Sequence, residues 1–138
     1  MYTLGRFLGY VIALGYLLTI LNYFVKWLNR SVMARRPKED NVRKVFTRFM
    51  RFIVSNHRLF AIITTVALFA HFLVQFQSWG LYPTGAIAGA LLLVQGSLGG
   101  FGTYVKKKKP GAWLLIHRMV AILLGLAIVL HVLTARFS

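Results

Sequence analysis

The amino-acid sequence predicts an all-α integral membrane protein in which residues 1–138 form a single four-helix bundle. Three observations predict this class. Hydrophobic residues make up 58% of the chain and charged residues only 14%. The mean hydropathy is positive, at +0.67. The apolar residues are gathered into four long blocks, and each block reaches the roughly 20 residues that a helix needs to cross a bilayer core about 30 Å thick.

The expected transmembrane spans are residues 3–27, 58–79, 83–105 and 112–135. None of them alternates polar and apolar residues as a transmembrane β-strand does. Residues 28–57 are expected to form a basic amphipathic segment on the cytoplasmic side. This segment is either a helix lying on the membrane or an extension of the second span, because apolar residues recur in it at helical spacing. These are Val42, Val45, Phe46, Phe49 and Phe52.

The distribution of charge predicts the orientation. The chain has 17 Lys and Arg residues against two acids, Glu39 and Asp40. Such a charge is also found in nucleic-acid-binding proteins. Here the cations flank the apolar blocks, so we interpret them as topology signals and contacts to membrane lipid, and expect no nucleic-acid partner. The basic segment and the Lys106–Lys109 loop should face the cytoplasm. Both termini and the uncharged turn at residues 80–83 should lie outside a cell membrane that the chain crosses several times.

Several kinds of chemistry are excluded by composition. The chain has no cysteine, which removes disulfides, iron–sulfur clusters, thiolate metal sites and covalent c-type haem attachment. No carboxylate lies within a predicted span, and no serine stands beside a histidine with an orienting acid, so a hydrolase is not indicated. Gln75 and Gln95, which lie inside spans, are expected to make packing hydrogen bonds.

The four histidines form two pairs with the same spacing. His57 and His71 are 14 residues apart, and so are His117 and His131. Fourteen residues at 100° each fall about 40° short of four turns, so both members of a pair share one helix face, about 21 Å apart along the axis. The second and fourth spans run in the same direction. His57 is therefore expected at the depth of His117, and His71 at the depth of His131.

Two imidazoles that face each other at one depth are the ligands that a six-coordinate haem iron needs. We therefore predict two non-covalent haem b groups, one ligated by His57 and His117 and the other by His71 and His131. Zinc fits less well, because it would gather the histidines around one centre, whereas each pair is separated by about four helical turns. Packing histidines are the remaining alternative.

The two histidine-bearing spans also resemble each other, which predicts a parallel repeat. His57-Arg58 and His117-Arg118 are each followed by Ala-Ile at the same offset, namely Ala61-Ile62 and Ala121-Ile122. Arg58 and Arg118 could pair with haem propionates or extend to lipid headgroups. In the third span Gly85 and Gly99 are again 14 residues apart. They would let the backbone approach a flat ring closely, or they may serve helix packing alone.

These histidine pairs and glycines resemble those of the transmembrane di-haem cytochromes b. That group includes the four-helix haem core of the cytochrome bc complexes and the membrane domains of ferric reductases and NADPH oxidases. In those families two histidine pairs on two helices ligate two b haems, and glycines make room for them. Here His57, His71, His117 and His131 match the ligands, and Gly85 and Gly99 match the glycines.

The resemblance implies transmembrane electron transfer, as a subunit of a quinol- or ferric-reductase-like oxidoreductase. Electrons would move between quinol or a cytoplasmic reductase and an acceptor across the membrane. The implied partners are membrane lipid, quinone, a redox partner protein or flavoprotein, and further subunits in a homo- or hetero-oligomer. The alternative is a haem-free membrane adaptor or small transporter subunit, whose histidines pack or relay protons.

The predicted orientation can be tested with single cysteines, because the chain has none of its own. A membrane-impermeant thiol reagent added from outside should modify a cysteine placed at the turn around Gly80 and spare one placed at Lys107. The physical reason is the retention of basic loops on the cytoplasmic side. Labelling of the Lys107 position alone would invert the topology.

Overall fold

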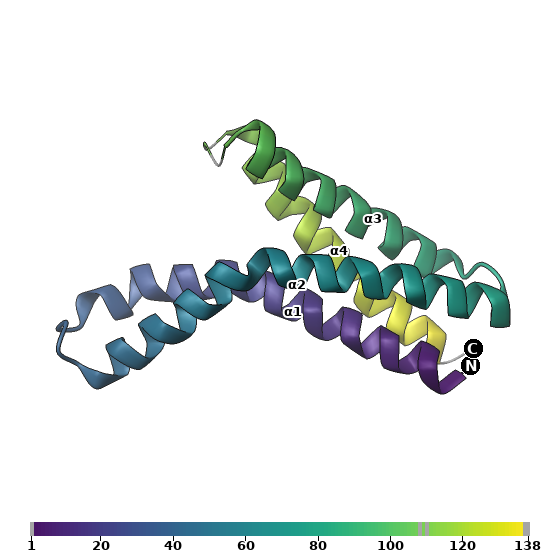
Figure 1. The fold of residues 1–138 in the computed structure, drawn as a ribbon, viewed down its shortest axis with the longest axis horizontal. Coiled ribbons are helices and arrows are strands. Elements are labelled where there is room, and N and C mark those ends of the chain that lie inside the picture. The colour runs from purple at the N-terminus through teal and green to yellow at the C-terminus, as the bar shows by residue number, and fades with distance from the viewer. Residues whose placement is uncertain (1, 108, 110, 137–138) are drawn as a thin grey trace. The chain divides into compact units, whose positions relative to one another are not determined.

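The computed structural model describes residues 2–107, 109 and 111–136 (Figure 1). Its elements are α1 (Tyr2–Ser31), the 3-10 helix η1 (Met33–Arg35), α2 (Asn41–Trp79), α3 (Pro83–Gly100), the π-helical turn η2 (Phe101–Val105) and α4 (Ala112–Arg136). As predicted, the described part of the chain contains four helices that are long and apolar enough to cross a membrane. Lys108 and Pro110 of the predicted basic loop lie outside the described residues.

Most of the basic segment 28–57 belongs to α1 and α2, and the rest is a short connection that contains η1. α2 runs without interruption for 39 residues, from Asn41 to Trp79. At 1.5 Å per residue this helix is about 58 Å long, almost twice the thickness of a bilayer core. α1 likewise continues past its apolar block to Ser31. The structure therefore supports the second of the two interpretations of this segment.

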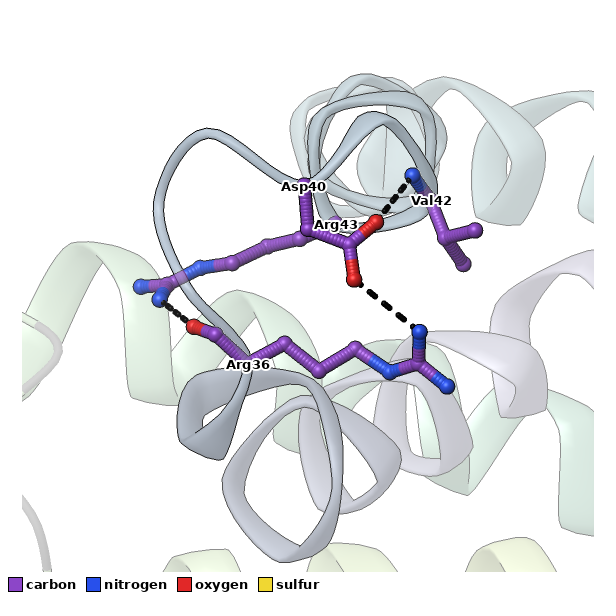
Figure 2. Close-up of polar contacts among 4 residues, drawn as sticks. All are labelled: Arg36, Asp40, Val42 and Arg43. Carbon is purple, nitrogen blue, oxygen red and sulfur yellow. Dashed lines mark hydrogen bonds and ion pairs between the residues drawn. The ribbon is translucent and has the colours of Figure 1, made fainter.

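The connection between α1 and α2 is explained by one proline and one acid. Arg36, which precedes Pro37, is extended at φ −79° and ψ 152°, as residues before proline prefer, so the helix cannot continue. Asp40 then caps α2, since its Oδ1 accepts a hydrogen bond of 2.7 Å from the Val42 amide. Its Oδ2 accepts from Arg36 at 3.0 Å, and Arg43 donates to the Arg36 carbonyl oxygen (Figure 2).

The connection between α2 and α3 is set by a glycine that ends one helix and a proline that begins the next. Gly80 ends α2 at φ 75°, a left-handed conformation that glycine adopts without strain. Pro83 occupies the first turn of α3, where its missing N–H is not needed. Lys107, after the third helix, also has a positive φ of 47°. Because both Gly80 and Lys107 are in this region, Leu81 and Lys106 are the better positions for the cysteine labels.

The chain divides into two compact units, residues Met1–Ile12 with Thr65–Ser138, and residues Ala13–Thr64. The first unit contains the beginning of α1, the second half of α2, and all of α3 and α4, and α3 packs against α4. A Cβ on Gly9 of α1 would meet His71 of α2, and one on Gly89 of α3 would meet Leu68 of α2. Segments of all four helices therefore come together in this unit.

The start of α1, the connection between α2 and α3, and the end of α4 lie at the same end of the first unit (Figure 1). This arrangement agrees with the expectation that both termini share a side with the turn at residues 80–83. It is the topology of an up-and-down bundle in which each helix is antiparallel to the next in the chain.

The second unit is the basic hairpin formed by the rest of α1 and the first part of α2. Its core is small: Val25, Ile53 and Thr64 are each only 1% exposed. The Thr64 hydroxyl is satisfied within its own helix, because it donates to the Phe60 carbonyl oxygen at 2.7 Å. Gly15 of α1 lies directly against Thr64, and this contact holds the two helices close together.

Most of the apolar surface faces outward. Large apolar side chains are exposed along every long helix, among them Phe7, Phe69, Ile87 and Leu126. A soluble monomer rarely exposes a continuous apolar patch of more than a few hundred Å². Lipid tails solvate such a surface without cost, and close helix contacts are then made by small residues. The glycines at the helix contacts of this chain fit that rule.

The cap at Asp40 makes the start of α2 sensitive to acid. The hydrogen bond from the Arg36 side chain, and then that from the Val42 amide, hold the pKa of this carboxyl below its ordinary 3.8. The cap should therefore stabilise α2 fully above the ordinary value and be lost as the pH falls through the lowered one. Amide exchange at Val42 should be protected at pH 6 in the wild type and faster in Asp40→Ala. Asp40→Asn, which keeps a capping oxygen, should retain most of the protection, whereas equal exchange in wild type and Asp40→Ala would contradict the cap.

Candidate functional site

Two of the four histidines, His71 and His131, meet in the first unit. They are called the outer pair because the predicted orientation puts them nearer the outside, and His57 and His117 are called the inner pair. His71 of α2 and His131 of α4 have ring centroids 6.4 Å apart, with the ring planes at 82° to each other. Both imidazoles are only partly exposed. The sequence-predicted pair is therefore brought together, and its two rings come from two helices that run in the same direction.

His71 is held by the backbone of α1. Its Nδ1 lies 2.9 Å from the Gly5 carbonyl oxygen. A carbonyl oxygen can only accept, so Nδ1 carries the proton and donates it. A Cβ built on Gly9, one turn later, would lie 3.6 Å from His71 Cε1. Two glycines of α1 thus seat one imidazole, one by its carbonyl group and the other by its lack of a side chain.

His131 is held in a similar way by α3. Its Nδ1 is 3.1 Å from the Thr84 hydroxyl, which is also 3.1 Å from the Thr134 hydroxyl. A Cβ on Gly85 would come within 2.9 Å of His131 Cε1 and 3.4 Å of its Nε2, closer than a carbon atom can ordinarily approach. Gly85 is therefore required for this ring position, and the glycine prediction is specific: Gly85 makes room for the imidazole itself.

The geometry of the outer pair fits an axially ligated haem. Each Nδ1 has a hydrogen-bond partner, which is how the other ring nitrogen of a ligating histidine is usually held. Two imidazoles bound to opposite sides of one ion at about 2.0–2.1 Å have ring centres about 6 Å apart, close to the separation observed. Within the described residues, no group of three or more His, Cys, Asp or Glu gathers at one point. A pair of imidazoles suits an iron whose remaining ligands come from a porphyrin, and is too few for a structural zinc site.

His117, the α4 member of the inner pair, has different partners. A Cβ on Gly99 of α3 would lie 3.5 Å from its Cε1, so the second predicted glycine also faces a histidine. The Gln95 side-chain nitrogen lies 3.2 Å from His117 Nε2, which confirms the packing hydrogen bond expected for this amide. The His117 Nδ1 is buried with no hydrogen-bond partner. Buried polar atoms without a hydrogen-bond partner are uncommon, which makes His117 a candidate functional residue.

The surroundings of His117 include a local irregularity of α3. Phe101–Val105 form a π-helical turn, in which the Lys106 amide donates to the Phe101 carbonyl oxygen at 3.0 Å. Such turns are frequent at functional sites. Gly102 in this turn lies against the indole of Trp113, whose ring centroid is 6.3 Å from that of His117. The end of α3 therefore shapes the inner histidine site.

His57, the α2 member of the predicted inner pair, belongs to the second unit and is half-buried on α2. The Gly15–Thr64 contact fixes the antiparallel register of α1 and α2 in this unit, and counting along both helices brings Asn22 to the level of His57. Arg58 and Arg118 have exposed side chains, which suits either a propionate or a lipid headgroup. The pairing of His57 with His117 and both arginine roles stay predictions.

The residues midway between the two histidines of α2 and of α4 are buried to the same extent. Thr64 lies midway between His57 and His71, and Leu124 lies midway between His117 and His131. Each of these two side chains is 1% exposed. The face that carries the histidines is therefore the buried face in both helices, as a shared site requires.

Several residues of the site were missed by sequence reasoning. Gly5 and Gly9 position His71, and Thr84 and Thr134 hold the His131 side. The sequence contained one signal for these contacts. Gly85 and Gly99 have the same 14-residue spacing as His117 and His131, and in an antiparallel neighbour Gly85 is then level with His131 and Gly99 with His117. Gly9 of the first span is level with His71 in the same way.

The sequence matches no protein-family model, and no curated protein or solved structure matches it. Fold and site together define a chain with four helices long and apolar enough to cross a membrane in its described part, and with a histidine pair between α2 and α4.

The close contact of Gly85 with His131 predicts an unequal effect of two matched substitutions in α3. Gly85→Val should destabilise the protein by about 1–3 kcal/mol, because the new side chain overpacks against a ring held by Thr84. Gly96→Val is the control, since nothing lies within 4 Å of a Cβ there. Circular dichroism during a titration from mild detergent into SDS would measure both. Equal stability of the two variants would mean that the Gly85 contact does not hold His131.

Proposed function

We propose that the protein transfers electrons across the membrane through two haem b groups, one bound by His71 and His131 and the other by His57 and His117. The observation that carries the proposal is the outer pair: two imidazoles at one level, 6.4 Å apart, each held through Nδ1. Four histidines repeated at one spacing on two parallel helices extend the same arrangement to a second level.

When bound, haem supplies an iron that takes up and releases one electron. The protein's part is to hold, orient and insulate it. The Gly5 carbonyl oxygen accepts a hydrogen bond from the His71 Nδ1–H group, which fixes the ring and would strengthen Nε2 as a ligand. Thr84 holds the His131 ring in the same way, through a hydroxyl group that also contacts Thr134. In a bilayer the surrounding apolar side chains would exclude water, and the resulting low dielectric would favour charge-neutral states of the site.

The inner level requires one local change. Ligation through His117 Nε2 needs the Gln95 amide to turn away, because that amide now donates to the same nitrogen. Gly99 leaves space beside the ring. Arg58 and Arg118 would pair with propionates at this level. Electron donors and acceptors consistent with the arrangement are quinol in the bilayer, a cytoplasmic reductase or flavoprotein, and an oxidant on the outer side.

The second candidate is a haem-free membrane adaptor or small transporter subunit. It is favoured by the polar contacts that the histidines make with their own protein, namely Gln95 with His117 and Thr84 with His131. Such contacts can lock a packing or proton-relaying histidine in place. The two candidates differ in colour: only the first gives a Soret band in the purified protein.

The haem proposal predicts two extractable b haems per chain in a pyridine haemochrome assay. His71→Ala and His131→Ala should remove the same low-spin spectral component, and His57→Ala and His117→Ala the other, because ligands of one iron must lie at one depth. Gln77→Ala, an exposed polar position on α2, is the control and should change neither component. Circular dichroism of each variant would show that the helices still form.

Two results would reject this model. A colourless protein purified from haem-replete cells would favour the adaptor. Loss of the same component in His57→Ala and His71→Ala would contradict the two-level pairing, because these residues are about 21 Å apart along α2.

A further inference from the structure

Two adjoining hollows open on the basic hairpin of the second unit. The first has a volume of about 370 Å³ and is lined by Lys38, Arg43, Lys44, Thr47, Arg48 and Arg51. The second, of about 460 Å³, lies between α1 and α2 and includes Lys26, Arg30, Met50 and Val54. Thr47 and Arg51 line both. Both volumes are in the range of small-molecule sites.

The charge of these hollows is of one sign. In the described part of the chain, seven cations and no carboxylate line them. Asp40 is committed elsewhere, to the Arg36 guanidinium and the Val42 amide. Arginine guanidinium groups form paired hydrogen bonds with phosphate oxygens, and Arg48 and Arg51 present two of them one turn apart. The lining is therefore suited to a phosphate-bearing anion.

The position of the cations on α2 also calls for an anion. Lys44 and Arg48 are four residues apart, where like charges repel each other. Arg43 and Lys44 lie in the first turns of α2, which contain no acid, and the positive end of the helix dipole disfavours cations there. A bound anion would remove both penalties at once.

The second hollow indicates what the anion is attached to. Lys26 and Arg30 lie at the end of the apolar block of α1, so this hollow is expected where the helix would leave the hydrocarbon. Met50 and Val54 give it an apolar lining that a free phosphate ion would not use. We propose that the two hollows bind one anionic phospholipid, with its phosphate at Arg48 and Arg51 and its glycerol and upper acyl carbons against Met50 and Val54. This site is independent of the haems.

The test compares two double variants that remove equal charge. Arg48→Gln/Arg51→Gln alters the hollows, and Lys106→Gln/Lys107→Gln alters the other basic loop. Full-length protein in mild detergent is mixed with phosphatidylglycerol or phosphatidylcholine, and bound lipid is counted by native mass spectrometry. Wild type and the lysine variant should retain phosphatidylglycerol in preference to phosphatidylcholine. The arginine variant should lose that retention by on the order of tenfold or more. Circular dichroism and the conservative Arg51→Lys variant, which should keep partial binding, show that the hairpin is intact.

Three outcomes would overturn the proposal. Equal loss in both double variants would mean diffuse attraction and not a site. Unchanged retention in the arginine variant would place the lipid elsewhere. Displacement of the lipid by millimolar inorganic phosphate, at constant ionic strength, would show that the hollows recognise phosphate without its lipid.

Discussion

The contact between a glycine of one helix and an imidazole of its antiparallel neighbour is the constraint on which the rest of this structure depends. Gly9 faces His71, Gly85 faces His131 and Gly99 faces His117. A Cβ at Gly85 would clash with the ring it faces. In lipid, where apolar burial does not drive helices together, such close approaches decide which helices pack and in what register. The same contacts also set the height and direction of each ring.

The two units differ in the kind of polar groups that they contain. In the first unit, the polar groups around His71 and His131 have defined partners, as the Gly5 carbonyl group has in His71. In the second unit, cations accumulate without enough acids to balance them, and the single acid at the start of α2 is used as a helix cap. The first pattern holds a buried group in one orientation, and the second attracts an anion from outside the chain. The proposed haem and phospholipid sites follow from these two patterns separately.

The differences between the two histidine levels carry mechanistic meaning. His71 and His131 each use Nδ1 for a hydrogen bond, whereas His117 uses Nε2 and leaves Nδ1 without one. Shortly after Gly99 the third helix widens into a π-helical turn that includes Gly102. In the proposed haem sites, the His71–His131 pair would keep its hydrogen bonds on ligation, whereas ligation through His117 Nε2 would require Gln95 to move. Two haems held so differently would have different reduction potentials, since hydrogen bonding to the ligand tunes the iron.

Much of this protein follows from the sequence by itself. Apolar blocks of sufficient length predicted four helices. The equal 14-residue spacing of the histidines on α2 and on α4 predicted that His71 and His131 lie at one level, because helical periodicity is a local property. Three matters depended on the tertiary structure. Whether residues 28–57 form a separate helix was decided by the unbroken run of α2 from Asn41. The partners Gly5, Thr84 and Gln95 come from helices distant in the chain, and their contacts depend on helix register. The second basic hollow arises only where α1 and α2 lie together, since its lining comes from both helices.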